Sequence, residues 1–163
     1  MIAERVLTLP NVLERRTAAA AQGKRVVLTN GCFDLLHRGH VTYLEQSASL
    51  GDILIVAINS DESVRELKGP SRPLNHETDR AHIIASLRCV DFAFIFQGPR
   101  LDAEIAAIKP DLYTKAGDYT LETMDAGERD ALIAAGTAIR FMPFVSGHST
   151  TNTVARMQSQ VLS

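Results

Sequence analysis

The chain has 163 residues, a formal net charge of −2, and a composition that is 45% hydrophobic and 22% charged. This balance is typical of one globular domain and disfavours a protein that binds a long stretch of nucleic acid. Because no run of about 20 apolar residues exists and residues 1–23 lack a signal-peptide pattern, we expect a cytoplasmic protein without a membrane segment.

The order of apolar runs and amphipathic segments predicts an α/β fold. Residues 6–22 have the pattern of a helix that ends at Gly23 and braces the sheet. Strands are expected at 25–29, 52–59, 90–96, 111–115 and 137–144. Helices are expected from about 39, at 61–67, 75–89, 101–109 and 128–135, and again near 149–157. This alternation predicts a Rossmann-like, doubly wound, mostly parallel five-stranded sheet with helices on both faces, in one domain over residues 1–163.

The turn after the first strand is the main candidate site. Asn30 and Gly31 form a turn signal, and His37, Gly39 and His40 stand where the next helix begins. Free backbone N–H groups at a helix start bind anions, and two histidines three residues apart can face the same space. The pattern favours phosphate chemistry, although packed histidines or half of a metal site would give the same spacing.

Three further segments carry cations that are candidates to join this site. Lys68 and Arg72 lie in a loop that Pro and Gly keep irregular, and such a loop either closes over an anionic ligand or is a solvated surface loop. Arg80, on the helix that follows, either is surface charge or reaches inward. Lys115 ends a strand and enters a glycine turn, which is where open α/β sheets place ligands.

Near the end of the chain, hydroxyl side chains open a helix at Ser149, Thr150 and Thr151. Hydroxyls beside free N–H groups make a second anion site, although hydroxyl-rich helix caps are also common without a ligand. The gathered positive character suggests a polyphosphate ligand. The chain has neither G-x-G-x-x-G nor G-x-x-x-x-G-K-[ST], which disfavours dehydrogenases and P-loop kinases.

The two cysteines, Cys32 and Cys89, lack ligand-type spacing and are expected to be reduced thiols. Cys32 lies in the turn after the first strand, and no base is placed in the sequence to activate it.

Residues 31–40, Gly-Cys-Phe-Asp-Leu-Leu-His-Arg-Gly-His, resemble the G-x-F-D-x-x-H-x-G-H signature of the cytidylyltransferase-like nucleotidyltransferases. The resemblance continues through 68–69, 72–73, 80, 115–119 and 149–152. Within that family the chain is most similar to the D-glycero-β-D-manno-heptose 1-phosphate adenylyltransferase group. Many members carry a fused sugar kinase domain, and this chain is expected to be a stand-alone transferase.

The resemblance implies a role for each matching residue. The implied catalytic residues are His37, His40 and Lys68. The implied nucleotide-binding residues are Asn30, Gly31, Cys32, Phe33, Gly39, His40, Arg80, Lys115, Gly117, Asp118, Ser149, Thr150 and Thr151. The implied acceptor-binding residues are Asp34, Arg72, Lys115 and Tyr119.

The implied reaction transfers AMP from ATP to a heptose 1-phosphate, releasing pyrophosphate and giving ADP-heptose. Mg²⁺ is expected to arrive with the nucleotide, because no acidic cluster in the sequence would hold it alone. ATP and a sugar phosphate are the expected partners, with no nucleic acid or membrane, and a homodimer is the base-rate expectation.

Three alternatives remain open at this point. The first is the same chemistry with CTP and glycerol 3-phosphate or another phospho-alcohol, although Phe-Val-Ser-Gly at 144–147 replaces the Arg-Thr-Glu-Gly of those enzymes. The second is a nucleotide-binding regulator that turns nothing over. The third is a metal-binding module built on His37 and His40, which lacks further ligands nearby.

Overall fold

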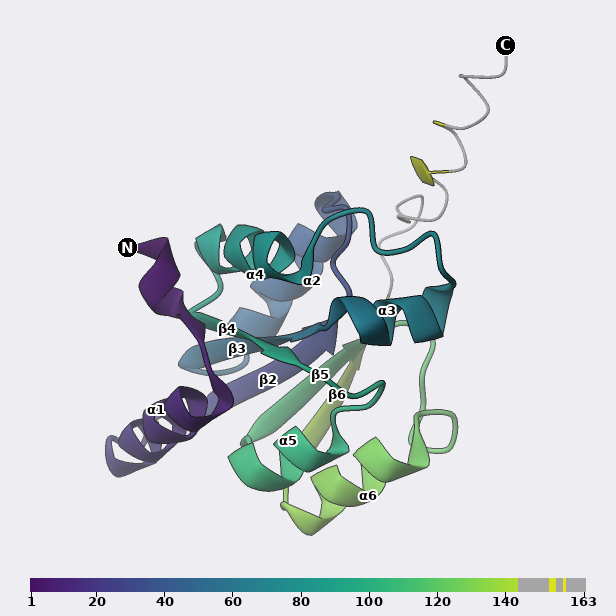
Figure 1. The fold of residues 1–163 in the computed structure, drawn as a ribbon. Helices are drawn as coiled ribbons and strands as arrows, with labels where there is room; N and C mark the ends of the chain where they lie inside the picture. The colour runs from purple at the N-terminus through teal and green to yellow at the C-terminus, as the bar shows by residue number, and fades with distance from the viewer. Residues whose placement is uncertain (144–152, 155–156, 158–163) are drawn as a thin grey trace.

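The computed structural model describes residues 1–143, 153–154 and 157, and its centre is a twisted parallel sheet (Figure 1). The six strands of the sheet are β1 (Val6–Leu7), β2 (Val26–Gly31), β3 (Ile53–Asn59), β4 (Phe92–Phe96), β5 (Leu112–Ala116) and β6 (Ala138–Met142). Their order is β1-β4-β3-β2-β5-β6, and all described neighbours pair in parallel. The predicted α/β class and doubly wound sheet are confirmed.

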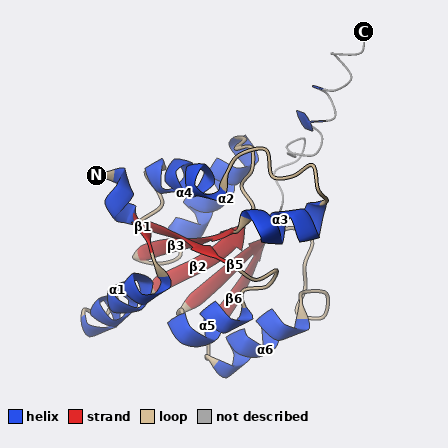
Figure 2. Cartoon of the chain, viewed as in Figure 1, coloured by secondary structure: helices blue, strands red, loops and turns tan. Residues whose placement is uncertain are grey.

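Helices lie on both faces of the sheet (Figure 2). The helical elements are η1 (Ile2–Arg5), α1 (Leu9–Ala21), α2 (Arg38–Ala48), α3 (Asp61–Lys68), α4 (Glu77–Ser86), α5 (Asp102–Ile108) and α6 (Ala126–Ala134). Because successive strand residues face opposite sides, Val26 and Leu28 pack with α1, α5 and α6, whereas Val27 packs with α2 and α4. The near-continuous apolar run of β3 follows from burial on both faces.

The prediction of five strands is wrong by one. Residues 6–7 belong to β1 rather than to a helix, and Val6 and Leu7 pair with Ala93 and Phe94 of β4. The helix begins only at Leu9, where Pro10 suits its first turn. A strand of two residues has no periodicity of its own, so its conformation depends on pairing with the edge of β4.

The order of the strands creates a crevice at one edge of the sheet. The chain moves outward from β2 through β3 to β4, then returns to the other side of β2 to form β5 and β6. The connections after β2 and β5 therefore diverge, and ligands of open α/β sheets bind beyond the carboxyl ends of such strands. None of the helices in the described part of the chain is long and apolar enough to cross a membrane.

Candidate active site

A cavity of about 420 Å³ opens at the carboxyl ends of β2 and β5. The residues that line it and were expected at the site are Asn30, Gly31, Cys32, Phe33, His40, Lys68, Lys115 and Tyr119. Lining residues that the sequence did not single out are Tyr43, Asn59, Leu67, Pro99, Arg100, Ala116 and Glu128. The signature turn, the loop lysine and the second glycine turn thus meet at one place.

The signature turn is tightly folded around Phe33. A Cβ at Gly31 would lie 2.8 Å from the Phe33 ring, so only glycine fits there without a shift. Phe33 itself has a φ of +46°, which is uncommon for a residue other than glycine and which is typical of functional sites. Its ring meets His40 edge to face, with centroids 5.3 Å apart. The turn therefore packs directly against a histidine of the site.

The two signature histidines stack at the start of α2. His37 is the residue before the helix, its carbonyl accepts from the N–H groups of His40 and Val41, and the two imidazole centroids are 3.8 Å apart. Only His40 lines the cavity. Burial, with the nearby His37 and Lys68, lowers the pKa of His40 to about 4, so the ring is neutral at pH 7.

Lys68 brings positive charge to the cavity from α3. Ser60 caps the start of this helix by accepting from Ser63 N, and Gly69 ends it with a φ of +96°. Lys68 is the last helical residue and is exposed. Among the described residues it has no ion pair, so its charge is uncompensated by a carboxylate.

The carboxylate of Asp34 anchors the loop that follows Lys68. It accepts hydrogen bonds from Arg72 Nε at 2.6 Å and from the N–H groups of Leu74 and Asn75 at 2.8 and 2.9 Å. Burial opposes ionisation, but these hydrogen bonds outweigh it and hold the pKa of Asp34 below its usual value. Neither Asp34 nor Arg72 lines the cavity. Asp34 and Arg72, both predicted to bind the acceptor substrate, therefore bind each other in this structure and position the loop after Lys68.

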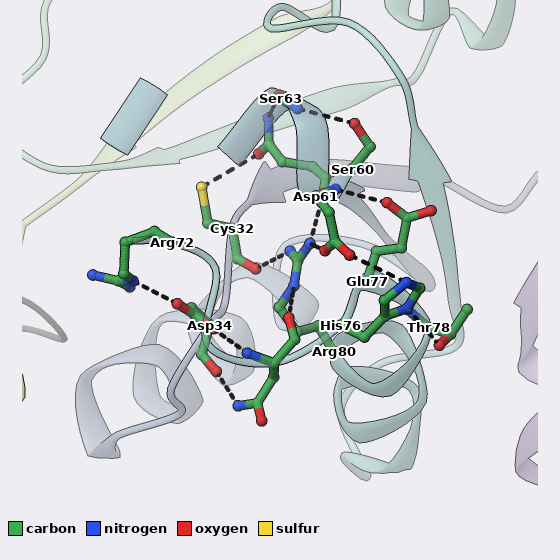
Figure 3. A network of polar contacts seen from close by, with 12 residues as sticks. Cys32, Asp34, Ser60, Asp61, Ser63, Arg72, His76, Glu77, Thr78 and Arg80 are labelled. Carbon is green, nitrogen blue, oxygen red and sulfur yellow. Dashed lines mark hydrogen bonds and ion pairs between the residues drawn. The ribbon is translucent and has the colours of Figure 1, made fainter. Parts of the chain in front are cut away.

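Arg80 lies within a network of polar contacts that includes the cavity-lining residue Cys32 (Figure 3). Its fully buried guanidinium donates to the carbonyls of Cys32, Asn59 and Asn75 at 2.6, 2.8 and 3.0 Å. It also pairs with Asp61 Oδ1 at 2.8 Å. These bonds join α4 to the ends of β2 and β3 and to the start of α3. In this structure Arg80 crosslinks these elements and does not line the cavity, and its contact with a nucleotide stays a prediction.

Cys32 lies directly beside this network and lines the cavity. Burial raises the pKa of its thiol, although the charges of Lys68 and Arg80 oppose the shift. The thiol is therefore protonated at neutral pH and is a poor nucleophile.

Lys115 is held by a carboxylate that the sequence analysis did not find. Glu128, in the first turn of α6, is 2% exposed and lies 3.1 Å from Lys115 Nζ. The Lys115 ammonium also lies over the Tyr119 ring, 5.1 Å from its centroid. An acid in the first turn of a helix is ordinary, so the sequence held no signal that this one faces a cavity.

The other predicted residues are placed as follows. Gly39, Gly117 and Asp118 are next in sequence to residues that line the cavity but do not line it themselves. Gly117 has a φ of +122° and donates to Met142 O, which fixes the turn after β5. Ser149, Thr150 and Thr151 lie outside the described residues. Within the described part of the chain, no group of three or more His, Cys, Asp or Glu residues could hold a metal ion.

Comparison with known proteins shows which family this chain belongs to and which proteins it resembles. A family model described as Cytidylyltransferase-like matches residues 28–156. The bifunctional protein HldE of Pelobacter propionicus is 49% identical over 140 residues, which cover 86% of this chain and 28% of that protein. HldE of Alkalilimnicola ehrlichii is 47% identical over 154 residues, covering 94% of this chain and 32% of that protein. The chain thus spans about a third of the length of these relatives.

Solved structures show the same arrangement of elements. The lipopolysaccharide core biosynthesis protein from Thermoplasma volcanium aligns with a TM-score of 0.62 and 28% identity, covering 76% of this chain and 98% of that one. Pantoate-beta-alanine ligase from Francisella tularensis, at 14% identity and a TM-score of 0.57, shares the fold alone.

Proposed function

Because the chain belongs to the cytidylyltransferase-like family of nucleotidyltransferases, we propose that it transfers AMP from ATP to D-glycero-β-D-manno-heptose 1-phosphate. Pyrophosphate leaves and ADP-heptose is the product. The observation that carries this proposal is the meeting of His40 and Lys68 at one cavity beyond β2 and β5. The similarity to HldE and to a lipopolysaccharide core biosynthesis protein supports the choice of acceptor.

The chemistry needs no general base. The second pKa of a sugar phosphate is about 6, so at neutral pH the acceptor is a dianion and already a nucleophile. The protein's task is to hold two anions in line and to stabilise charge on the α-phosphoryl group and the leaving pyrophosphate. Lys68, which has no carboxylate partner in the part of the chain that the structure describes, suits the second task.

A neutral His40 fits this reaction better than a charged one would. Because its pKa is about 4, the imidazole of His40 is uncharged at pH 7, and it acts as a hydrogen-bond donor rather than as an acid. Bound phosphates would raise that pKa, because negative charge nearby favours the imidazolium. Only when phosphates are bound can the His40 ring therefore add positive charge to that of Lys68. The N–H groups of Arg38 and Gly39, at the start of α2, add uncharged donors.

Mg²⁺ fits the site as a companion of the nucleotide. Glu128, which lines the cavity, is paired with Lys115, and Asp34 of the signature turn is bound by Arg72 and two backbone N–H groups. These residues do not form a ligand set of their own, so phosphate oxygens would hold the ion. When bound, the ion neutralises phosphate charge.

The test is an assay of pyrophosphate release across ATP, CTP, GTP and UTP. Each nucleotide is paired with D-glycero-β-D-manno-heptose 1-phosphate, glucose 1-phosphate and glycerol 3-phosphate. The proposal predicts the highest kcat/KM for ATP with the heptose 1-phosphate. A preference for CTP with glycerol 3-phosphate would replace it with the cytidylyltransferase alternative. Binding of ATP without turnover of any acceptor would favour a nucleotide-binding regulator.

A further inference from the structure

The cations of the cavity fall into two groups. Arg100 and Lys115 both line the cavity, and each pairs with an acid at the start of α6. Arg100 Nε lies 3.0 Å from Asp125, and Lys115 Nζ lies 3.1 Å from Glu128. Lys68 has no such partner among the described residues. One side of the cavity is therefore positive, and the side next to α6 carries compensated charge.

The Lys115–Glu128 pair is fixed from several directions. Glu128 Oε1 accepts from the N–H of Leu101 at 3.2 Å, while Oε2 accepts from Lys115. Lys115 is 18% exposed, and Tyr119 covers its ammonium from one side. The charged groups are thus held in one geometry before any ligand arrives. An ordered, partly buried pair of this kind loses little conformational entropy when a ligand binds.

Both members of the pair keep unused hydrogen-bonding capacity. An ammonium has three N–H donors, and Glu128 takes one of them. Each oxygen of the Glu128 carboxylate accepts one hydrogen bond from the described residues and can accept another. A ligand atom at this wall therefore meets a donor and an acceptor about 3 Å apart. A hydroxyl group suits that arrangement because it both donates and accepts, whereas a phosphate oxygen only accepts and is repelled by the carboxylate.

We propose that the Lys115–Glu128 pair binds the hydroxyl groups of a sugar ring, while the phosphates lie toward His40 and Lys68. This inference rests on the proposed function. It states that the side of the cavity next to α6 binds a sugar of the substrates rather than a phosphate. Two sugars enter the reaction, the ribose of the nucleotide and the acceptor itself, and both carry adjacent hydroxyls. Tyr119, whose ring lines the same wall, gives the apolar face of a sugar a surface to pack on.

The test measures binding by calorimetry for pairs of ligands that differ in hydroxyl groups. ATP is compared with 2′,3′-dideoxy-ATP, and the heptose 1-phosphate with cyclohexyl phosphate, while tripolyphosphate reports on the phosphate side alone. The proteins are the wild type, Glu128→Gln, and Asp130→Asn as a matched control on the same helix. Asp130 is 69% exposed and pairs only with its neighbour Arg129 in the described structure.

We expect the wild type to bind the hydroxylated member of one pair at least about tenfold more tightly, since a hydrogen bond to a charged group is worth this much. In Glu128→Gln the preference should fall to within about twofold, with tripolyphosphate affinity unchanged and Asp130→Asn behaving as wild type. Loss of the ATP preference identifies the ribose, and loss of the acceptor preference identifies the acceptor sugar. Equal weakening of both members of each pair, or weaker binding of tripolyphosphate, would overturn the proposal.

A second variant covers the case in which Glu128→Gln unfolds. Lys115→Gln keeps a donor at the wall but removes the charge, and the same loss of preference is expected. Binding is measured without turnover, so the result is separate from the proposed function. A chain that shows the hydroxyl preference but never releases pyrophosphate would overturn only the proposed reaction.

Discussion

The imidazole rings of His37 and His40 stack with an interplanar angle of 19° and a centroid separation of 3.8 Å. Two protonated rings would repel at this distance, and burial disfavours the charge of the His40 ring further. A backbone hydrogen bond with Leu35 favours protonation of His40, but burial and the neighbouring His37 and Lys68 outweigh it. The free protein therefore holds a neutral donor beside a cavity that is suited to an anion.

The free energy of unfolding should decrease as the pH is lowered, because His40 resists protonation in the folded chain. Its pKa is about 4 in the folded chain and about 6.5 when unfolded, so between these values only the unfolded chain binds the proton. The free energy of unfolding should thus decrease as pH falls from about 6.5 to about 4. In His40→Gln this decrease should be smaller. Urea unfolding at pH 7, 6 and 5 measures it, with His82→Gln, an exposed histidine of α4, as the control.

An unchanged pH slope in His40→Gln would show that the ring titrates alike in the folded and unfolded chains. The account of a neutral His40 would then be wrong.

Tyr43 should matter for the docking of α2. Its buried hydroxyl lies 2.6 Å from Thr29 Oγ1 and donates to Thr114 Oγ1 at 3.0 Å, which joins the helix of His40 to β2 and β5. Tyr43→Phe should lower the free energy of unfolding by about 1–2 kcal/mol, because two buried hydroxyls each lose a partner. Urea unfolding measures this loss. Tyr119→Phe, at a side chain that is 41% exposed, should change stability little, and an equal loss in both variants would contradict the assignment.

Arg80→Lys tests whether this arginine serves the fold or the nucleotide. Lysine cannot reproduce the planar fork that reaches three carbonyls and Asp61, so we expect a loss of about 3–5 kcal/mol in the free energy of unfolding. Arg65→Lys, at an exposed position of α3, is the control. If Arg80→Lys keeps wild-type stability but loses ATP affinity, the result contradicts the structural role and supports the nucleotide-binding role predicted from the sequence.

Motifs and long periodic segments were predictable, whereas pairings between distant side chains were not. The strand, turn and helix around residues 25–48 followed from apolar spacing and from the signature. β1 did not, because two residues carry no period and their conformation depends on β4. The pairing partners of the site residues were also not predictable. Glu128 is an acid in the first turn of a helix, which is common, so the sequence did not indicate its ion pair with Lys115. Nor did the sequence indicate that Asp34 and Arg72 form an ion pair.

The central claim is that His40 and Lys68 together stabilise the transferring phosphoryl group. It is tested most directly by the initial rate of pyrophosphate release from ATP and D-glycero-β-D-manno-heptose 1-phosphate. His40→Ala and Lys68→Ala should each lower kcat at least about a hundredfold, the loss expected for one strong transition-state donor. Lys24→Ala, at an exposed residue just before β2 and so at the opposite end of that strand, should retain the wild-type rate. Near-normal rates in both site variants would contradict the account.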